Sequence, residues 1–184
     1  MKKAFVFLAQ GFEEIEAVSI MDVLRRAGVE VVIVSISSKE KMVMGAHDIV
    51  IAADVIFDET DFSGGDMLIL PGGQPGTDNL NTHEGLKKLI KTYYNQNKYV
   101  AAICAAPLVF GEMGLLQGKK VVSYPGYENR LLGAEIAEND RVVVAGNIIT
   151  SKGPGTAIEF TLKLVELLIG KETAEKLRIG MIVK

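Results

Sequence analysis

The chain has 184 residues, of which 48% are hydrophobic and 23% charged, a balance typical of a soluble globular protein with enough chain for a sizeable core. The net charge of -3 and the lack of a Lys/Arg cluster argue against nucleic-acid binding. No apolar run approaches the roughly 20 residues of a membrane span, and the run after Lys3 is too short for a signal peptide. A single cysteine cannot form an internal disulfide, so we expect a cytoplasmic protein that binds neither nucleic acid nor membrane.

The predicted elements alternate between strands and helices along the chain. Short apolar runs rich in β-branched residues predict buried strands at residues 4–9, 29–37, 66–73 and 99–104. Apolar residues at helical spacing predict helices at residues 10–30, 83–98, 106–114, 153–170 and 171–178. Hairpins are expected around Gly45 and at Gly146-Asn147, with a further strand at residues 119–125.

This alternation predicts one α/β domain over residues 1–184, with a mainly parallel central sheet and helices on both faces. In such sheets, sites form at the carboxyl ends of strands, near the point where strand order reverses. Three segments follow predicted strands there: AQGFEEIE, PGGQPG and CAAP. We therefore expect the functional residues in these three segments.

Cys104 is the only cysteine, and it lies where a predicted strand meets a helix. Pro107 fits only the first turn of that helix, because a helix interior needs the N–H that proline lacks. The frame A-I-C-A-A resembles a nucleophile elbow, with Ala102 and Ala106 in place of the usual glycines. We expect the helix N-terminus to lower the pKa of the Cys104 thiol. From these residues alone, an inert buried cysteine is an equally good interpretation.

The PGG turn is a second candidate. Gly72 and Gly73 allow close approach of the backbone, so an N–H of this turn could join that of Ala105 in an oxyanion hole. A plain tight turn is the alternative, and for the turn alone it is the better interpretation.

The first predicted helix begins with Glu13, Glu14 and Glu16. Acidic residues in a first turn ordinarily just complement the helix dipole. The helical spacing of Ile15 and Val18 predicts the core-facing side of this helix, and Glu16 lies nearer to that side than Glu13. A partly buried carboxyl has a raised pKa and can exchange a proton with a thiol, so Glu16 is a candidate proton carrier.

Histidine, the expected partner of a catalytic cysteine, occurs only at His47 and His83. His83 heads a predicted helix and is expected to cap it or lie at the surface, and His47 is expected to be exposed. No cluster of His, Cys and carboxylate residues is visible in the sequence, so we expect no metal and no other cofactor. The stretch GPGT at residues 153–156 opens a helix and could hold an anion, although it lacks the P-loop pattern.

Four stretches, AQGFEEIEAV, LPGG, AAICAAP and SKGPGTAIEF, together resemble the ThiJ/PfpI superfamily, specifically its DJ-1-like branch, over nearly the whole chain. The resemblance implies a flavodoxin-like three-layer sandwich, similar to class I glutamine amidotransferases, and a homodimer. It implies that Cys104 is the reactive residue and that Glu16 is a protonated glutamate hydrogen-bonded to its sulfur. It further implies that Gly73 and Ala105 are the backbone donors of the family's oxyanion pocket. We also expect Gly72, Tyr124 and Pro154 among the residues that bind the oxyanion or the substrate.

The chain departs from the family pattern at both customary histidine positions. Protease-like members carry histidine directly after the cysteine, where this chain has Ala105. The DJ-1-like branch often carries histidine before a proline in the following strand, where this chain has Tyr124. A Cys-His hydrolase would therefore lose a general base that normally contributes about 10²–10⁴-fold. Tyrosine is a poor base near neutral pH.

Three functions compete. We favour a cofactor-independent glyoxalase III-like or deglycase-like activity on reactive dicarbonyls or glycation adducts, with Cys104 as nucleophile and Glu16 as proton shuttle. The alternative is a redox-responsive stress or chaperone protein that senses oxidation at Cys104. A cysteine peptidase or amidase is least favoured, because it would need His47 to reach the site, for example across a dimer interface.

Overall fold

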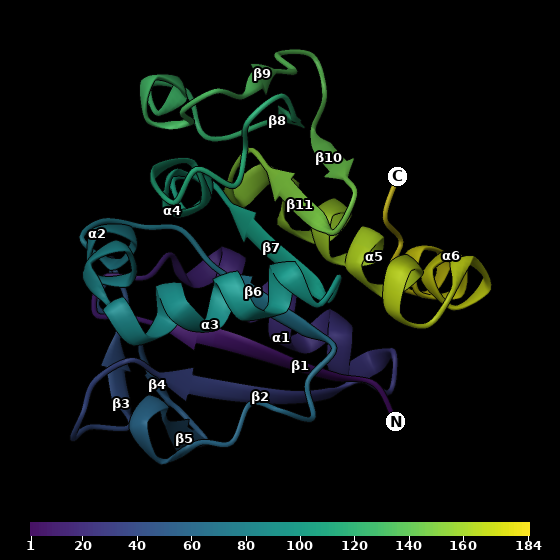
Figure 1. Ribbon diagram of the computed structural model, residues 1–184. Helices are drawn as coiled ribbons and strands as arrows, with labels where there is room; N and C mark the ends of the chain where they lie inside the picture. The colour runs from purple at the N-terminus through teal and green to yellow at the C-terminus, as the bar shows by residue number, and fades with distance from the viewer.

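The computed structural model describes residues 1–184 and is built around a seven-stranded sheet (Figure 1). Its strands follow the spatial order β10-β11-β7-β6-β1-β2-β5. In chain order, β1, β2, β5, β6, β7, β10 and β11 span Lys3–Leu8, Glu30–Ser35, Val55–Ile56, Met67–Leu70, Tyr99–Ile103, Val142–Ala145 and Ile148–Ser151. All neighbouring strands are parallel except β10 and β11, which form the predicted hairpin. The predicted mainly parallel sheet is confirmed.

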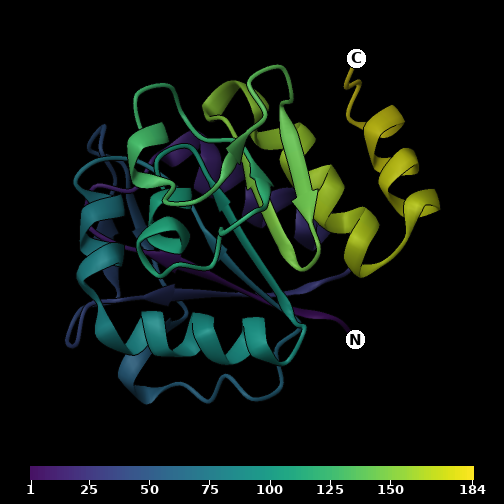
Figure 2. The same cartoon turned by 45° about the horizontal axis from the view of Figure 1, so that its top comes forward.

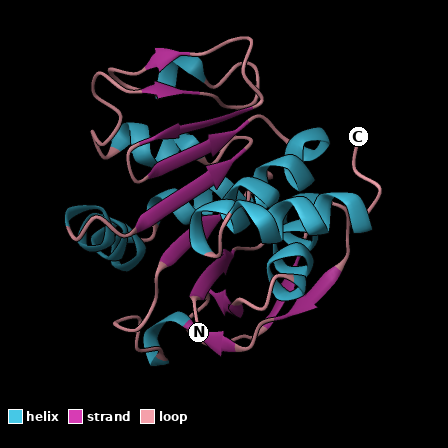
Figure 3. Cartoon of the chain, turned by 90° about the vertical axis from the view of Figure 1, so that its right-hand side faces the viewer, coloured by secondary structure: helices cyan, strands magenta, loops and turns pink.

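Helices lie on both faces of this sheet (Figures 2 and 3). One face is covered by α1 (Glu14–Arg26), α5 (Ala157–Leu168) and α6 (Lys171–Gly180). The other is covered by α2 (Gly76–Thr82), α3 (Glu84–Asn95) and α4 (Pro107–Glu112). No helix combines the length and apolarity needed to cross a membrane.

The central strand β1 shows how the sequence builds two cores. Val6 and Leu8 pack in the cluster that contains α1 and α5, whereas Phe5 and Phe7 pack in the cluster that contains α3. Alternate side chains of a strand point to opposite faces, so a strand covered on both sides must be apolar throughout. Each such side chain contributes about 1.5–3 kcal/mol when fully buried. The three-layer, flavodoxin-like sandwich is thereby confirmed.

Two small sheets lie outside the central one. The expected hairpin forms from β3 (Met42–Met44) and β4 (Val50–Ala52), and a parallel pair forms from β8 (Lys120–Val121) and β9 (Glu135–Ile136). The strand predicted at residues 119–125 is therefore only two residues long. Its continuation is a loop, in which the Val122 N–H donates to the Thr150 side chain and not to a strand. Short 3-10 turns, η1, η2 and η3, span Phe57–Glu59, Glu128–Arg130 and Pro154–Thr156.

The expected core face of α1 is wrong in part. Ile15 and Val18 are 58% and 47% exposed, whereas Ile20 and Leu24 are buried. Glu16 lies one helical turn before Ile20, so it shares the buried face and is 0% exposed. The burial expected for this glutamate is thus present, but on a different face of α1 from the predicted one.

The order of strands reverses beside β1, because β2 pairs with one edge of β1 and β6 pairs with the other. Sites of open α/β sheets form at such a reversal, beyond the carboxyl ends of the strands. The segments that follow β1, β6 and β7 are the three that carry Glu16, Gly72 and Cys104. The topology therefore brings these segments to one end of the sheet.

The packing of α4 against η2 offers a test of the fold. A Cβ added to Gly111 would overlap the Arg130 carbonyl oxygen and lie 2.8 Å from the Leu131 Cα. We expect Gly111→Ala to lower the free energy of unfolding by roughly 1–3 kcal/mol, because the backbone of η2 must move. The control is Gly180→Ala in α6, where no atom lies within 4 Å, and where alanine is favoured in a helix by up to about 1 kcal/mol. Urea unfolding measures both, and equal stabilities of the two variants would contradict this packing.

Candidate active site

Cys104 occupies a tight turn between β7 and α4. Its φ is +64°, a left-handed conformation that non-glycine residues rarely adopt. Hydrogen bonds fix the turn on both sides: the Cys104 N–H donates to the Ser151 carbonyl at 3.0 Å, and the Tyr124 N–H donates to the Cys104 carbonyl at 2.8 Å. Pro107 begins α4, as its missing N–H requires. The strand-to-helix turn expected here is present, and it presents a thiol that is 8% exposed.

Glu16 reaches this turn from the start of α1. Its Oε2 accepts a hydrogen bond from the Gly72 N–H at 2.7 Å, and its Oε1 is buried without a partner of good geometry. A Cβ added to Gly72 would lie 2.5 Å from the Cys104 Cβ and 2.9 Å from Glu16 Oε2. Only glycine at position 72 therefore allows the thiol and the carboxyl to approach each other.

The two predicted backbone donors also meet here. The N–H groups of Ala105 and Gly73 both act on the Cys104 sulfur as hydrogen-bond donors. Gly73 has a φ of +93°, and a Cβ on it would overlap the backbone nitrogen of Glu13. If a substrate carbon were bonded to this sulfur, the same two N–H groups would face the oxygen on that carbon as negative charge develops on it.

The pKa values of both acids are raised. Burial raises the pKa of Glu16 from 4.5 to about 7, opposed by hydrogen bonds from Gly72 and Cys104. Burial also raises the pKa of the Cys104 thiol, reinforced by the negative charge of Glu16 and opposed by the Ala105 and Gly73 amides. Because each anion disfavours the other in a buried place, the pair keeps one proton through the neutral range.

The lowered thiol pKa expected from the helix N-terminus is therefore wrong in direction. The helix that follows Cys104 is only six residues long, so few peptide dipoles add up at its N-terminus. Desolvation and the Glu16 charge outweigh it. Of the two acids, Glu16 ionises first as pH rises, so just above neutral pH the remaining proton of the pair resides on the Cys104 sulfur.

Tyr124 and Pro154 lie at the rim of the site. A Cβ built on Gly153, the residue before Pro154, would lie 3.1 Å from the Tyr124 ring and 3.9 Å from the Cys104 sulfur. The Tyr124 side chain is large and half-exposed. A cavity of about 210 Å³ opens between the loop at Tyr124 and the turn at residues 153–156. The predicted site residues are thus brought together, and their roles in chemistry stay predictions.

Both histidines have structural partners away from Cys104. His83 caps α3 by accepting the Leu86 N–H at 3.0 Å, as predicted. His47 is exposed, as expected, and its Nδ1 lies 2.7 Å from Glu14 Oε2. Glu14 is buried, and its pKa stays below the ordinary value although burial alone would raise it, because His47 supplies hydrogen bonds and charge.

The expectation that no His and carboxylate cluster exists is wrong. Glu13, Glu14 and His47 place ligand-type atoms within 4.8 Å of one another, because the β3–β4 hairpin lies against the start of α1. Both Glu14 oxygens already accept from His47, at 2.6 and 2.7 Å. Glu13 Oε2 caps α1 by accepting the Glu16 N–H at 2.7 Å. These atoms therefore satisfy one another, and the cluster holds the hairpin against the helix.

The raised pKa of Glu16 predicts a pH-dependent cost to stability. A carboxyl with a higher pKa in the folded state contributes fully to the free energy of unfolding at pH values below its unfolded pKa, which is near 4.5. That contribution is lost as pH rises through the folded pKa of about 7. Relative to wild type, Glu16→Gln should therefore gain roughly 2–3 kcal/mol of unfolding free energy between pH 4.5 and 8. Urea unfolding at several pH values measures this gain.

Glu14→Gln is the matched control for this measurement. The pKa of Glu14 is lowered, so its carboxylate stabilises above the unfolded value and this contribution is lost on acidification. The variant should therefore lose stability relative to wild type as pH rises. If both variants changed in the same sense with pH, the burial argument for Glu16 would be wrong.

Comparison with known proteins agrees with this geometry. The DJ-1/PfpI family matches residues 2–167. The chain is 41% identical over 174 residues to Protein DJ-1 homolog B of Arabidopsis thaliana, covering 94% of this chain but 40% of that protein. It is 35% identical over 178 residues to a glutathione-independent glyoxalase of Caenorhabditis elegans, covering 96% of this chain and 94% of that one.

Solved structures agree as well. Oxidized Toxoplasma gondii DJ-1 superimposes with a TM-score of 0.94 at 40% identity, covering 99% of this chain and 98% of that one. The chain spans about two-fifths of the plant relative but nearly all of the Toxoplasma chain. With a family match over residues 2–167 and these identities, the chain belongs to the DJ-1/PfpI family.

Proposed function

We propose that this protein is a cofactor-independent enzyme that converts reactive dicarbonyls to 2-hydroxy acids. The observation that carries the proposal is the buried Glu16 carboxyl beside the Cys104 thiol, both with raised pKa values, next to the backbone N–H groups of Ala105 and Gly73. This arrangement supplies a sulfur nucleophile, a mobile proton and an oxyanion site without a histidine. The glyoxalase name of the Caenorhabditis elegans relative supports the same reaction class.

The first step forms a carbon–sulfur bond. The Glu16 carboxylate takes the proton of the Cys104 thiol, and the thiolate so formed attacks the aldehyde carbon of a compound such as methylglyoxal. The aldehyde oxygen takes the negative charge, accepts hydrogen bonds from the Gly73 and Ala105 N–H groups, and then receives the Glu16 proton. The product is a hemithioacetal, and Glu16 is left as a carboxylate.

The second step moves a proton between carbons. The Glu16 carboxylate removes the hydrogen from the former aldehyde carbon and passes it to the neighbouring carbonyl oxygen, which gives an enediol. It then takes the hydroxyl proton of the sulfur-bearing carbon and returns it to the neighbouring carbon. A 2-hydroxy thioester results, and water then breaks the carbon–sulfur bond to release the 2-hydroxy acid and the thiol. One carbon is oxidised and its neighbour reduced, so water is the only co-reactant.

The same attack applies to early glycation adducts, which carry an equivalent carbonyl carbon. We therefore include a deglycase-like reaction in the proposal, with glycated groups as its substrates. We also propose a homodimer in the cytosol, since structures of this family are typically dimeric. A peptidase reaction is disfavoured, because Ala105 and Tyr124 occupy the positions where relatives carry histidine.

Methylglyoxal conversion tests the proposal. Purified protein should form lactate, and Cys104→Ser should abolish it. Glu16→Gln should reduce kcat by about 10²–10⁴-fold, as expected on removing a general acid–base group. Glu30→Gln, an exposed carboxyl on β2, is the matched control and should retain full activity. Lactate formation that survives in Cys104→Ser would show that the sulfur is not the nucleophile.

A second candidate function is redox sensing at Cys104. The observation that favours it is the set of donors around the sulfur, since the Ala105 and Gly73 N–H groups and a protonated Glu16 would stabilise a sulfinate. The oxidized state of the Toxoplasma gondii relative is consistent with such chemistry.

Mild peroxide treatment tests this second candidate. Peptide mass analysis should show addition of two oxygen atoms at Cys104 before oxidation of exposed methionines such as Met42. Glu16→Gln should form the sulfinate more slowly and pass on to the sulfonate more readily, because a protonated carboxyl is replaced by a weaker hydrogen-bond donor. A thiol that survives at Cys104 while Met42 is oxidised would argue against a sensing role.

A further inference from the structure

The cavity beside Cys104 has a chemical character that the reaction above does not use. Its volume is about 210 Å³, and its walls come from the loop at Tyr124, the residue before β10 and the segment that follows β11. Cys104 lies just behind this wall, because a Cβ built on the lining residue Gly153 would lie 3.1 Å from the Tyr124 ring and 3.9 Å from the Cys104 sulfur. A group bound in this cavity would therefore lie next to a substrate carbon attached to the sulfur.

Two cationic side chains, Lys152 and Arg141, line this cavity, and no acidic side chain does. Lys152 Nζ donates to the carbonyl oxygen of Glu138 and has no carboxylate within ion-pair distance. Glu128 and Glu138 line the separate cavity on the other side of Lys152. The Lys152 side chain thus lines the 210 Å³ cavity without a carboxylate partner.

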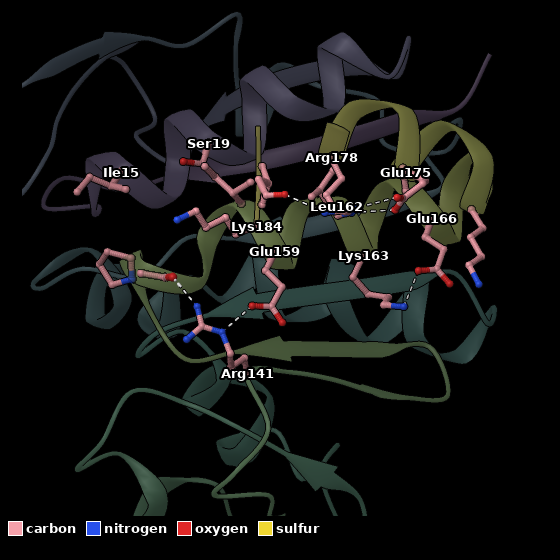
Figure 4. Close-up of a pocket in the computed structure, with 16 residues that line it drawn as sticks. Ile15, Ser19, Arg141, Glu159, Leu162, Lys163, Glu166, Glu175, Arg178 and Lys184 are labelled. Atoms are coloured by element: carbon pink, nitrogen blue, oxygen red, sulfur yellow. Dashed lines mark hydrogen bonds and ion pairs between the residues drawn. The ribbon is translucent and has the colours of Figure 1, made fainter. Parts of the chain in front are cut away.

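Arg141 is partly neutralised. Its Nε lies 2.6 Å from Glu159 Oε2, and its second terminal nitrogen donates to the Gly155 carbonyl at 2.8 Å (Figure 4). One terminal nitrogen of the guanidinium has no protein partner. Arg141 therefore contributes hydrogen-bond donors and a reduced charge, and Lys152 contributes most of the net positive charge.

The backbone adds a third favourable contribution. The turn η3 leads directly into α5, a helix of twelve residues whose N-terminus carries a partial positive charge. Residues 153–156, which open this helix, form one wall of the cavity. The lysine, the arginine and the helix start thus act in the same electrostatic sense on one space.

We propose that this cavity is an anion subsite, which binds a carboxylate or phosphate group carried by the carbonyl substrate. The substrate class is an acidic 2-oxoaldehyde, or a glycation adduct on a molecule with an acidic group near the reactive carbon. The choice of substrate rests on the proposed function, but binding of an anion next to Cys104 does not.

The largest cavity is a poorer candidate for this role. It measures about 640 Å³ and lies between α1, α5 and α6 (Figure 4). Three carboxylates, Glu159, Glu166 and Glu175, line it, whereas no acidic side chain lines the smaller cavity. The two cavities share Arg141, Pro154 and Gly155. A small acidic group would gain less in the larger cavity, because its carboxylates offset the positive charge of the lysines and arginines there.

Alkylation of Cys104 by two reagents of nearly equal shape tests the proposal. Iodoacetate carries a carboxylate, and iodoacetamide is neutral, so the ratio of their rate constants reports the electrostatic contribution of the cavity. We expect Lys152→Gln to lower the iodoacetate-to-iodoacetamide ratio by roughly fivefold, the effect of removing one nearby charge in a water-accessible place. Raising salt to about 1 M should lower the wild-type ratio, because screening shortens to about 3 Å.

Lys176→Gln is the matched control, since it removes the same charge from an exposed position on α6. Its ratio should equal that of wild type. An unchanged ratio in Lys152→Gln would overturn the proposal. A Cys104 that neither reagent can modify would also overturn it, because a usable subsite must open onto the sulfur.

A kinetic comparison separates this proposal from the proposed function and distinguishes phosphate from carboxylate. The ratio of kcat/KM for a phosphate-bearing 2-oxoaldehyde to that for methylglyoxal should fall several-fold in Lys152→Gln. If neither aldehyde is converted but the alkylation ratio responds, the subsite stands and the proposed function fails. If methylglyoxal is converted and neither ratio responds to Lys152→Gln, the proposed function stands and the subsite fails.

Discussion

The site depends on one constraint: a carboxyl and a thiol are buried against each other with room for only one negative charge. Burial raises the pKa of both groups, and the negative charge of Glu16 raises the pKa of the Cys104 thiol further. Glu16 therefore holds a proton at pH values where an exposed glutamate would have lost it. That proton can serve either the sulfur or a substrate oxygen, which is the property that both candidate functions require.

Backbone geometry makes this proximity possible. Cys104 takes a left-handed conformation, and Gly72 has no Cβ that would separate it from Glu16. Such a conformation costs of the order of 1–3 kcal/mol unless the surroundings hold it. Here the surroundings hold it through the Ser151 carbonyl and the Tyr124 N–H, on either side of the turn. The turn at Cys104 is thus fixed by the last residue of β11 and by a residue of the segment that follows β8.

Much of the fold could be predicted from the sequence, because its signals are local. Continuous apolar runs marked the strands buried on both faces, and Pro107 marked the start of α4. What the pattern missed was non-local. Ile15 and Val18 have the spacing of a buried face, yet α1 is rotated so that Glu16 is buried instead. Which helical face is buried depends on the partner helix, here α5, and its position cannot be read from α1 alone.

The same distinction applies to the site. Cys104, Gly72 and Glu16 could be proposed because each follows a strand, and the family resemblance supplied their pairing. The direction in which the pKa of the Cys104 thiol shifts could not be predicted from the sequence. It depends on burial and on the Glu16 charge more than on a nearby helix end. The Glu14–His47 contact was also hidden, since it joins residues 33 positions apart through the seating of a hairpin. The sequence likewise does not indicate that Lys152 and Arg141 line the same cavity, because only the folded structure brings them together.

The three glutamates at the start of α1 also affect how the whole molecule behaves in an electric field. The formal net charge of -3 counts every carboxyl as ionised and every histidine as neutral. With a pKa of about 7, Glu16 is only about half ionised at neutral pH, and the carboxylate beside His47 raises the pKa of that imidazole. The folded protein is therefore less acidic than its composition, and unfolding releases protons at neutral pH. At neutral pH these two groups make the folded chain less negatively charged than the unfolded chain, so electrophoretic mobility there responds to whether the site is assembled.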